Sequence, residues 1–463
     1  MTSGGGLRPD GPLLSSGVRT RGVVSGVRSI AWWTVCVWAA TRLCVPAQAI
    51  ELRNDLLLLG QVRDGDQSRQ QEAPVDFYGD QGVSGLPHGT TADTYYRLSH
   101  DFGLDHGPTQ FYAGYMHVPS AVPGVDLTVG RQFLSETPGG VFVADAGKVR
   151  FDPGGPVSFT IFGGAPRYFE PTFSSPSLSQ DEIIFGGNIR TTHLKNGYLT
   201  LGVLQQERDE RVLKQLVTAA GARSFPTVPG LPNVYGVFSF DADHQNIDQG
   251  TAGVDVFLLQ PRLLLNLESS YYKPQDNGKQ LVTNINRRED AVFQLFSLSQ
   301  ELQFRGGLRY ALTRALSAYG DYSYQRFNKQ ENISENGHIG KVGMSWQPGG
   351  DGLELVGVEY YAADSSGGNL NGGRAYYVNR VYDRIQFRTK IDVAYYQKES
   401  NQNDTAVASL LGLGYVFVPG LFCEVYMEAN RNQRFNEDFR FGFTVTYNGR
   451  TRTDKPTRTG EAS

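Results

Sequence analysis

The chain has 463 residues, of which 43 are Lys or Arg and 47 are Asp or Glu, and its formal net charge is −4. This balance provides no basic footprint for nucleic acid, so nucleic acid is excluded as a partner. Only one of the three cysteines, Cys423, lies beyond residue 49, so the rest of the chain can form no intramolecular disulfide.

The first 49 residues have the pattern of a cleaved secretory signal peptide. Several arginines precede the apolar run IAWWTVCVWAA (30–40), and Ala47 and Ala49 are small residues at the two positions that a signal peptidase reads. The run is shorter than the roughly 20 apolar residues of a spanning helix. We expect cleavage before Ile50 and export of the chain that follows.

The N-terminal half of the exported chain contains segments typical of β-strands. They lie near 50–62, 92–103, 109–118, 125–134, 148–151, 156–164, 182–192 and 197–207. Residues 208–250 include the strand-like runs VLKQLVTAAGA and VYGVFSF, but their division is open. No stretch beyond residue 49 is apolar over the roughly 18 residues that mark a transmembrane helix. This does not argue against a transmembrane barrel, because only alternate residues of its strands touch lipid.

The C-terminal half consists of paired segments with two kinds of connection. One kind is very short and often holds Pro or Gly, which fix turn dihedrals: 260–261, 313–314, 348–351 and 419–420. The other kind is longer and polar, as in 273–290, 328–336, 363–373, 397–403 and 431–436. Short and long connections alternate strictly, which is typical of an outer-membrane barrel with short turns on one side and long loops on the other.

Each strand that runs from a short turn to a long loop ends in tyrosine. The tyrosines are Tyr271, Tyr272, Tyr322, Tyr324, Tyr360, Tyr361, Tyr395, Tyr396 and Tyr426. Tyrosine favours the bilayer interface, so these residues predict an aromatic girdle. The alternative is that they only reflect the β-propensity of tyrosine.

The segment EDFRFGFTVTY (437–447) alternates between apolar and polar residues at every step. Such alternation, repeated over long segments, predicts an all-β fold: a transmembrane antiparallel up-and-down β-barrel over 50–447, followed by a polar periplasmic tail at 448–463. The raw count of segments is about 21. A barrel with both ends in the periplasm needs an even number of strands. We therefore expect about 18 strands, with 16 as the next choice.

The signal peptide, the alternating connections and the last strand, FRFGFTVTY, together resemble those of Gram-negative outer-membrane β-barrels of the porin class. The segment VDLTVGRQFLSETPGG (125–140) is also similar to segments of substrate channels of the alginate-export type. This resemblance implies an outer-membrane location, lipid and the barrel-assembly machinery as partners, and a water-filled channel for small hydrophilic solutes or ions. The residues after Tyr447 depart from the usual pattern, which ends at the final aromatic residue.

In such a channel, charged residues on the inward face of the strands would set selectivity. The candidates that line the pore are Arg262, Asn266, Glu268, Arg305, Arg309, Asp321, Arg384, Arg388, Glu424, Glu428 and Arg440. The Gly-rich segment 135–155 is a candidate constriction loop, with Asp145, Lys148, Arg150 and Asp152 as its charges. Alternatively, the charges are solvated wall and the segment is an ordinary hairpin.

No enzyme, metal or cofactor site is predicted. The seven histidines have no recognisable partner spacing for catalysis. The segment DADHQNIDQG (241–250) lacks the glycine and the closing acid of a calcium loop, and no haem-attachment motif is present. One alternative function is left, a scaffold barrel that sheaths a partner such as a cytochrome. The sequence decides neither whether a plug or periplasmic partner binds nor what the oligomeric state is.

Overall fold

The structure is a computed structural model that describes residues 50–64, 71–102, 109–135, 142–168, 177–178, 182–191, 193–259, 262–273, 300–330, 333–348, 354–365, 368–397, 403–431 and 438–452. The predicted signal peptide lies outside these residues. Within them, no helix is long and apolar enough to cross a membrane.

The described residues form long β-strands and one short 3-10 helix, η1 (Pro87–Gly89). The strands of the first half are β1 (Glu51–Asp64), β2 (Gln71–Glu72), β3 (Pro74–Ser84), β4 (Thr91–Asp101), β5 (Thr109–Val122), β6 (Val125–Leu134), β7 (Phe142–Phe151), β8 (Val157–Tyr168), β9 (Ser177–Leu178), β10 (Glu182–Thr191), β11 (Gly197–Arg208) and β12 (Arg211–Ser224). Those of the second half are β13 (Asn233–Asp241), β14 (Asn246–Leu258), β15 (Leu263–Tyr272), β16 (Gln300–Ala311), β17 (Leu316–Gln330), β18 (Ile333–Trp346), β19 (Glu354–Ser365), β20 (Gly368–Val381), β21 (Ile385–Gln397), β22 (Asn403–Val418), β23 (Leu421–Arg431) and β24 (Asp438–Arg452).

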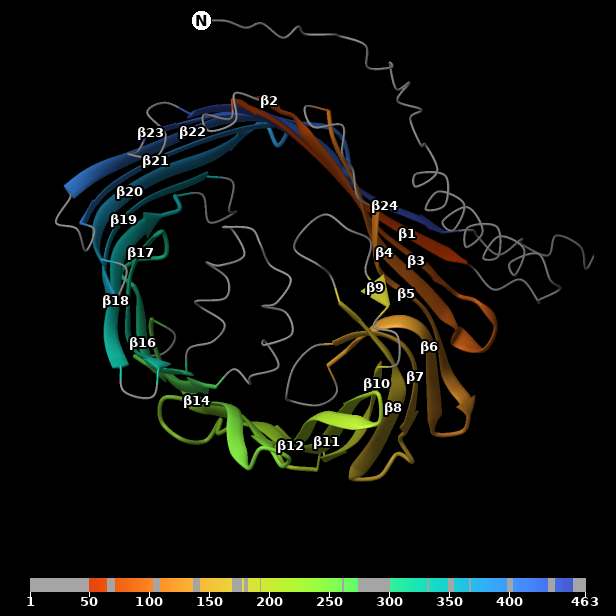
Figure 1. Cartoon of the computed structure of the whole chain (residues 1–463). Helices are drawn as coiled ribbons and strands as arrows, with labels where there is room; N and C mark the ends of the chain where they lie inside the picture. Colours follow the sequence, from red (N-terminus) through yellow and green to blue (C-terminus); the bar gives the residue numbers. More distant parts are fainter. Residues whose placement is uncertain are drawn as a thin grey trace, which may run out of the picture. The chain divides into compact units, whose positions relative to one another are not determined.

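The strands form one closed antiparallel barrel (Figure 1). Each long strand pairs with the next along the chain, and β1 pairs with β24, with Glu51 opposite Arg452 and Arg63 opposite Arg440. The strands β2 and β9 have two residues each and attach to β1 and β8 outside this ring. The predicted all-β antiparallel barrel is confirmed, but the described ring has 22 strands and not about 18 or 16.

The error in the strand number came from the N-terminal half. Residues 208–250, which were not divided, form all of β12 and β13 and the start of β14. The strand β3 was missed entirely, although Val75, Phe77 and Val83 alternate there with Asp76, Asp80 and Ser84. The reduction of the raw count to 18 therefore removed real strands. At the other end, β24 extends to Arg452, so residues 448–452 of the predicted tail belong to the barrel.

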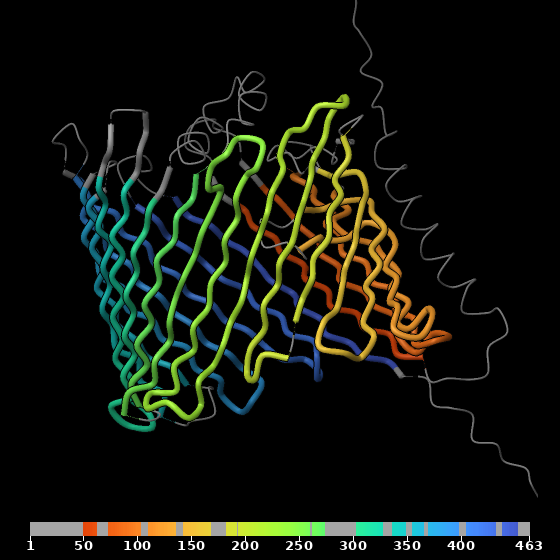
Figure 2. Tube along the Cα trace, turned by 90° about the horizontal axis from the view of Figure 1, so that it is seen from below, coloured from red at the N-terminus to blue at the C-terminus, as the bar shows by residue number. Residues whose placement is uncertain are grey.

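The connections fall at two ends of the barrel, between which the strands run at a slant (Figure 2). We call one the turn end: it holds the start of β1, the end of β24 and tight turns such as Pro419-Gly420, where Gly420 has a φ of 89°. The opposite end, the loop end, holds the end of β15, the start of β16 and their equivalents. Because the strand number is even, both ends of the barrel chain lie at the turn end.

The two faces of each strand differ as expected. In β24, Phe439, Phe441 and Phe443 are exposed, whereas the alternate positions hold Arg440 and Thr444. Side chains of the polar row from eight strands, β4 to β8 and β10 to β12, line one cavity. Only the inner face of a barrel can bring so many strands around one space, so the polar row faces inward. The outward row is apolar, the reverse of a water-soluble protein.

The predicted tyrosine girdle is only half present. Tyr322, Tyr360 and Tyr395 lie in the outward row and are about half exposed. The neighbours of Tyr360 and Tyr395 face inward, where Tyr361 donates a hydrogen bond to Asp392 and Tyr396 to Asp404. This split follows from the two-residue period of a strand, which sends adjacent side chains to opposite faces.

Candidate functional site

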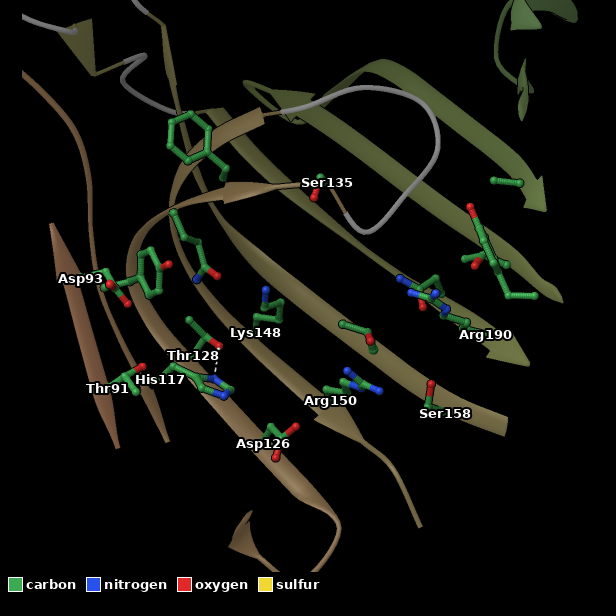
Figure 3. Close-up of a pocket in the computed structure, with 18 residues that line it drawn as sticks. Thr91, Asp93, His117, Asp126, Thr128, Ser135, Lys148, Arg150, Ser158 and Arg190 are labelled. Carbon is green, nitrogen blue, oxygen red and sulfur yellow. Dashed lines mark hydrogen bonds between the residues drawn. The ribbon is translucent and has the colours of Figure 1, made fainter. Parts of the chain in front are cut away.

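The clearest cavity of the described residues lies inside the barrel, along strands β4 to β12 (Figure 3). Its volume is about 750 Å³, within the range of about 300–1,000 Å³ that is typical of small-molecule sites. Most of its lining side chains are polar. The cavity therefore offers water, or a hydrophilic solute, many hydrogen-bonding partners.

One wall of the cavity is basic. Lys148 and Arg150 are two residues apart on β7, so both point inward, and Arg190 comes from β10. Arg150 lies opposite Thr160 of β8, and Arg190 lies opposite Ser158 of the same strand. The three cations thus flank one strand that presents hydroxyl groups between them.

Arg150 and Arg190 are each held in place by a neighbouring side chain. The Arg150 guanidinium lies 2.9 Å from Asp152 in the following turn, where both side chains are largely exposed. The Arg190 guanidinium lies over the Tyr198 ring, 4.6 Å from the centroid. A guanidinium stacked on a ring keeps its in-plane N–H groups available for an acceptor.

The acidic groups lie on β4 and β6, and Asp126 of β6 is directly opposite Arg150 in the strand register. Asp93 on β4 lies 3.1 Å from Arg53, and Asp126 on β6 accepts a hydrogen bond of 2.9 Å from the backbone N–H of Ser120. Nearby, the His117 ring nitrogen and the Thr128 hydroxyl are 3.1 Å apart. The cavity is therefore polarised, with cations on β7 and β10 and acids on β4 and β6.

The loop-end parts of β6 and β7, residues 130–135 and 142–146, lean across the cavity, and we call them the flap. Gln132 and Phe133 both line the cavity although adjacent strand residues point to opposite faces, so the strand must pass over it. Figure 3 shows β6 bending near its end, with Ser135 over the cavity. The flap thus covers the cavity on the loop side.

An apolar cluster joins the flap to the barrel wall. Leu134 and Ala144 of the flap are buried together with inward-facing residues of β10, β11 and β12, which are Ile184, Leu204 and Leu216. Each of these side chains is at most 1% exposed. Such burial on the concave face means that the flap packs against the wall instead of standing in solvent.

An ionic clamp holds the other face of the flap. The Asp145 carboxylate accepts hydrogen bonds from Arg131 Nε, at 2.7 Å, and from Arg167 Nε of β8, at 2.8 Å. Arg131 also donates to the backbone oxygen of Phe111 on β5, at 2.9 Å. The clamp therefore ties the flap to the strands on both of its sides.

The bend in β6 requires a glycine. Gly130 has a φ of 124°, and a Cβ there would lie 2.4 Å from the backbone oxygen of Gly114. We expect Gly130→Ala to lower the free energy of unfolding by about 1–3 kcal/mol, through backbone strain and this overlap. Urea unfolding followed by heat-modifiable electrophoretic mobility measures it.

Gly147 provides the matched control for this substitution. It lies on β7, opposite Val129, and a Cβ there would meet no atom within 4 Å. Gly147→Ala should change the free energy of unfolding by less than about 0.5 kcal/mol. Equal stability of the two variants would contradict the requirement for glycine at the bend.

The predicted constriction loop at 135–155 needs correction. Residues 142–151 form strand β7, because their alternating pattern pairs with β6 and β8. Lys148 and Arg150 line the cavity from this strand, Asp145 belongs to the clamp, and Asp152 lies in the turn to β8. The part 136–141 lies outside the described residues.

Most of the predicted pore-lining residues lie on the inward face and contact neighbouring inward residues. The ion pairs are Arg305–Asp321 at 3.5 Å, Arg388–Glu424, and Arg440 with Asp438. Asn266 donates to Asp255 at 2.7 Å, and Glu268 and Glu428 accept from Tyr235 and Asn430. Arg309 shares the inward phase of β16, opposite Tyr319. Their role in selectivity stays a prediction.

Two of the predicted residues do not belong to the strand walls. Arg262 lies in the turn before β15, and Arg384 in the turn before β21. The sequence placed them in strands because a two-residue period does not mark the strand's first residue. They therefore lie at the turn end of the barrel and not along its wall.

Sequence reasoning missed two groups of inward charges. One is Arg190 of the basic wall, which lies in the N-terminal half, where the strand residues were not sorted into an inward and an outward row. The other is a network on β19 to β21, in which Arg374 lies 2.8 Å from Asp392 and 3.6 Å from Glu359. The signal for this network was present, since Glu359, Arg374 and Asp392 all alternate with apolar residues.

No protein-family model and no curated protein matches the chain. Solved structures with a similar fold include that of Pseudomonas aeruginosa OccK3 (OpdO), with 12% sequence identity and a TM-score of 0.45 over 87% of this chain and 96% of that chain. Another is P. aeruginosa OpdK with vanillate, with 10% identity and a TM-score of 0.44 over 87% and 99%. At these identities and TM-scores, the likenesses assign neither a family nor a solute.

Proposed function

We propose that the protein is an outer-membrane channel of the porin class, through which small hydrophilic solutes or ions diffuse across a Gram-negative-type outer membrane. One observation carries the proposal: a closed barrel of 22 described strands is apolar on its outward face and polar on its inward face. Hydrocarbon outside and water inside require this arrangement, and closure leaves no strand edge unpaired in lipid.

The width of the barrel supports a channel. Barrels of 16 or more strands are too wide for their own side chains to fill, so water or an inserted segment occupies the interior. The flap occupies the side along β5 to β12, where the cavity lies beneath it. The wall from β15 to β24 is lined by ion pairs such as Arg305–Asp321 and Arg374–Asp392, which water can solvate.

Conductance tests the proposal. The protein that begins at Ile50, purified alone in detergent and added to planar bilayers, should produce stepwise ion currents. Proteoliposomes should also swell in small neutral sugars, because the interior is open to water. The same protein unfolded by boiling is the control and should give neither signal.

A scaffold barrel would behave differently in the same experiment. Folded protein that gives no current, or that carries a bound partner through purification and conducts only after its removal, would contradict the channel and favour the scaffold. Folding is checked separately by heat-modifiable mobility, so failure to conduct is distinguished from failure to fold.

A further inference from the structure

We infer that the cavity beneath the flap is a binding site for a small organic anion that carries hydroxyl groups. The inference rests on the proposed channel function and adds a substrate class to it. The site would hold the solute during passage, between the basic wall of β7 and β10 and the hydroxyl groups of β6, β8 and β11.

The basic wall provides the recognition of the anionic group. Figure 3 shows Lys148, Arg150 and Arg190 directed toward the same space. Arg190, stacked on Tyr198, is held with its N–H edge available to an oxyanion, and Arg150 is anchored at its side by Asp152. Guanidinium and ammonium groups bind carboxylate and phosphate oxygens through charge-assisted hydrogen bonds, which are stronger than neutral ones.

The acidic residues of the cavity offset only part of this wall: Asp126 lies opposite Arg150 in the register, whereas Lys148 lies opposite Thr128 and Arg190 opposite Ser158. Asp93 and Asp126 lie on β4 and β6, and each is engaged, by Arg53 and by the Ser120 backbone N–H respectively. An anion would therefore bind at the β7–β10 side, with its far end toward the acids. Donors such as hydroxyl groups are suited to that far end.

The hydroxyl groups between the cations define the rest of the ligand. Ser158, Thr160 and Thr200 line the cavity next to the arginines and are each less than a tenth exposed, and Asn188 adds an amide. Groups of this kind exchange hydrogen bonds with hydroxyl groups, while an alkyl chain would leave them without partners. A hydroxylated acid or a sugar-type phosphate has both features that the cavity provides.

Current block tests the inference. Gluconate represents hydroxylated carboxylates, glycerol 3-phosphate represents phosphates, glucose is the neutral analogue and butyrate the anion without hydroxyl groups. In planar bilayers, at least one of the first two should reduce the current of the wild-type channel at concentrations where glucose and butyrate do not. Comparison of the two shows whether a carboxylate or a phosphate is preferred.

Substitutions test whether the anions block the current by binding in the cavity. Arg190→Gln and Lys148→Gln should each raise the half-blocking concentration about tenfold or more, the loss of one charged hydrogen bond. Arg314→Gln, which removes an exposed arginine from the turn between β16 and β17, is the control and should leave it unchanged. Heat-modifiable mobility confirms that each variant is folded.

Three results would overturn the inference: block by glucose as strong as by the anions, absence of block by both hydroxylated anions, or equal block in the Arg190 and Arg314 variants. In each case the ion current itself persists, so the channel function survives. If folded protein carries no current, the channel function fails instead. Titration calorimetry of the same anions in detergent then decides independently whether the site exists.

Discussion

Val425→Arg is expected to make folding into the membrane less favourable by about 2–4 kcal/mol, the cost of an arginine on the lipid face near the midplane. Val425 lies at the middle of β23, in the outward row, and is 61% exposed. No inward partner can reach an arginine there. Folding into lipid vesicles, followed by heat-modifiable mobility across a urea series, measures the loss.

Thr444→Arg is the matched control for this substitution. Thr444 lies on the neighbouring strand β24, in the inward row, directly opposite Glu424. An arginine there enters the polar interior beside a carboxylate, so folding should be unchanged while ion selectivity shifts toward anions. Equal folding yields for the two variants would refute the assignment of the outward and inward faces.

The sequence alone was sufficient for the class of fold where apolar and polar residues alternate without interruption. The strand β24 and the hairpin turn at Pro419-Gly420 were predicted this way, because period and turn chemistry are local properties. The number of strands was not predicted correctly from such local patterns. It depended on β3, whose alternation was overlooked, and on residues 208–250, where small residues such as those of β12 blur the contrast between faces.

The candidate site could be predicted only in part. The period alone predicts that Arg305 and Asp321 face inward, but which residues pair depends on the register between strands, which turn geometry and packing decide. Likewise, Arg190 joins Lys148 in one cavity only because β8 lies between β7 and β10. No pattern within a single strand carries that information.

The flap is the feature that the sequence predicted least well. The segment 135–155 was singled out as a constriction loop on its glycines and charges, yet its residues 142–151 form a strand, β7. Its inward position comes from the bend at Gly130 and from the packing of Leu134 against residues of β10 to β12. These contacts join segments more than 40 residues apart in the chain.

The clamp at Asp145 makes the flap the part of the interior most sensitive to a single charge. Arg131 and Arg167 both direct guanidinium N–H groups at this one carboxylate, and their side chains are only 16% and 12% exposed. Without the carboxylate, two like charges would lie close together and poorly solvated. Repulsion between them acts on the flap, because Arg131 belongs to β6 and Arg167 to β8.

Asp145→Asn is therefore expected to lower the free energy of unfolding by about 2–4 kcal/mol and to increase single-channel conductance, because the flap loses its side-chain clamp to β8 and keeps only the backbone pairing with that strand. Urea unfolding and planar-bilayer currents measure the two effects. Asp152→Asn is the control: it removes an exposed ion pair with Arg150 at the other end of the same strand, which is worth less than about 1 kcal/mol. A stable Asp145 variant with wild-type conductance would show that the apolar cluster and the backbone pairing hold the flap without the clamp, since Leu134 and Ala144 remain packed in both variants.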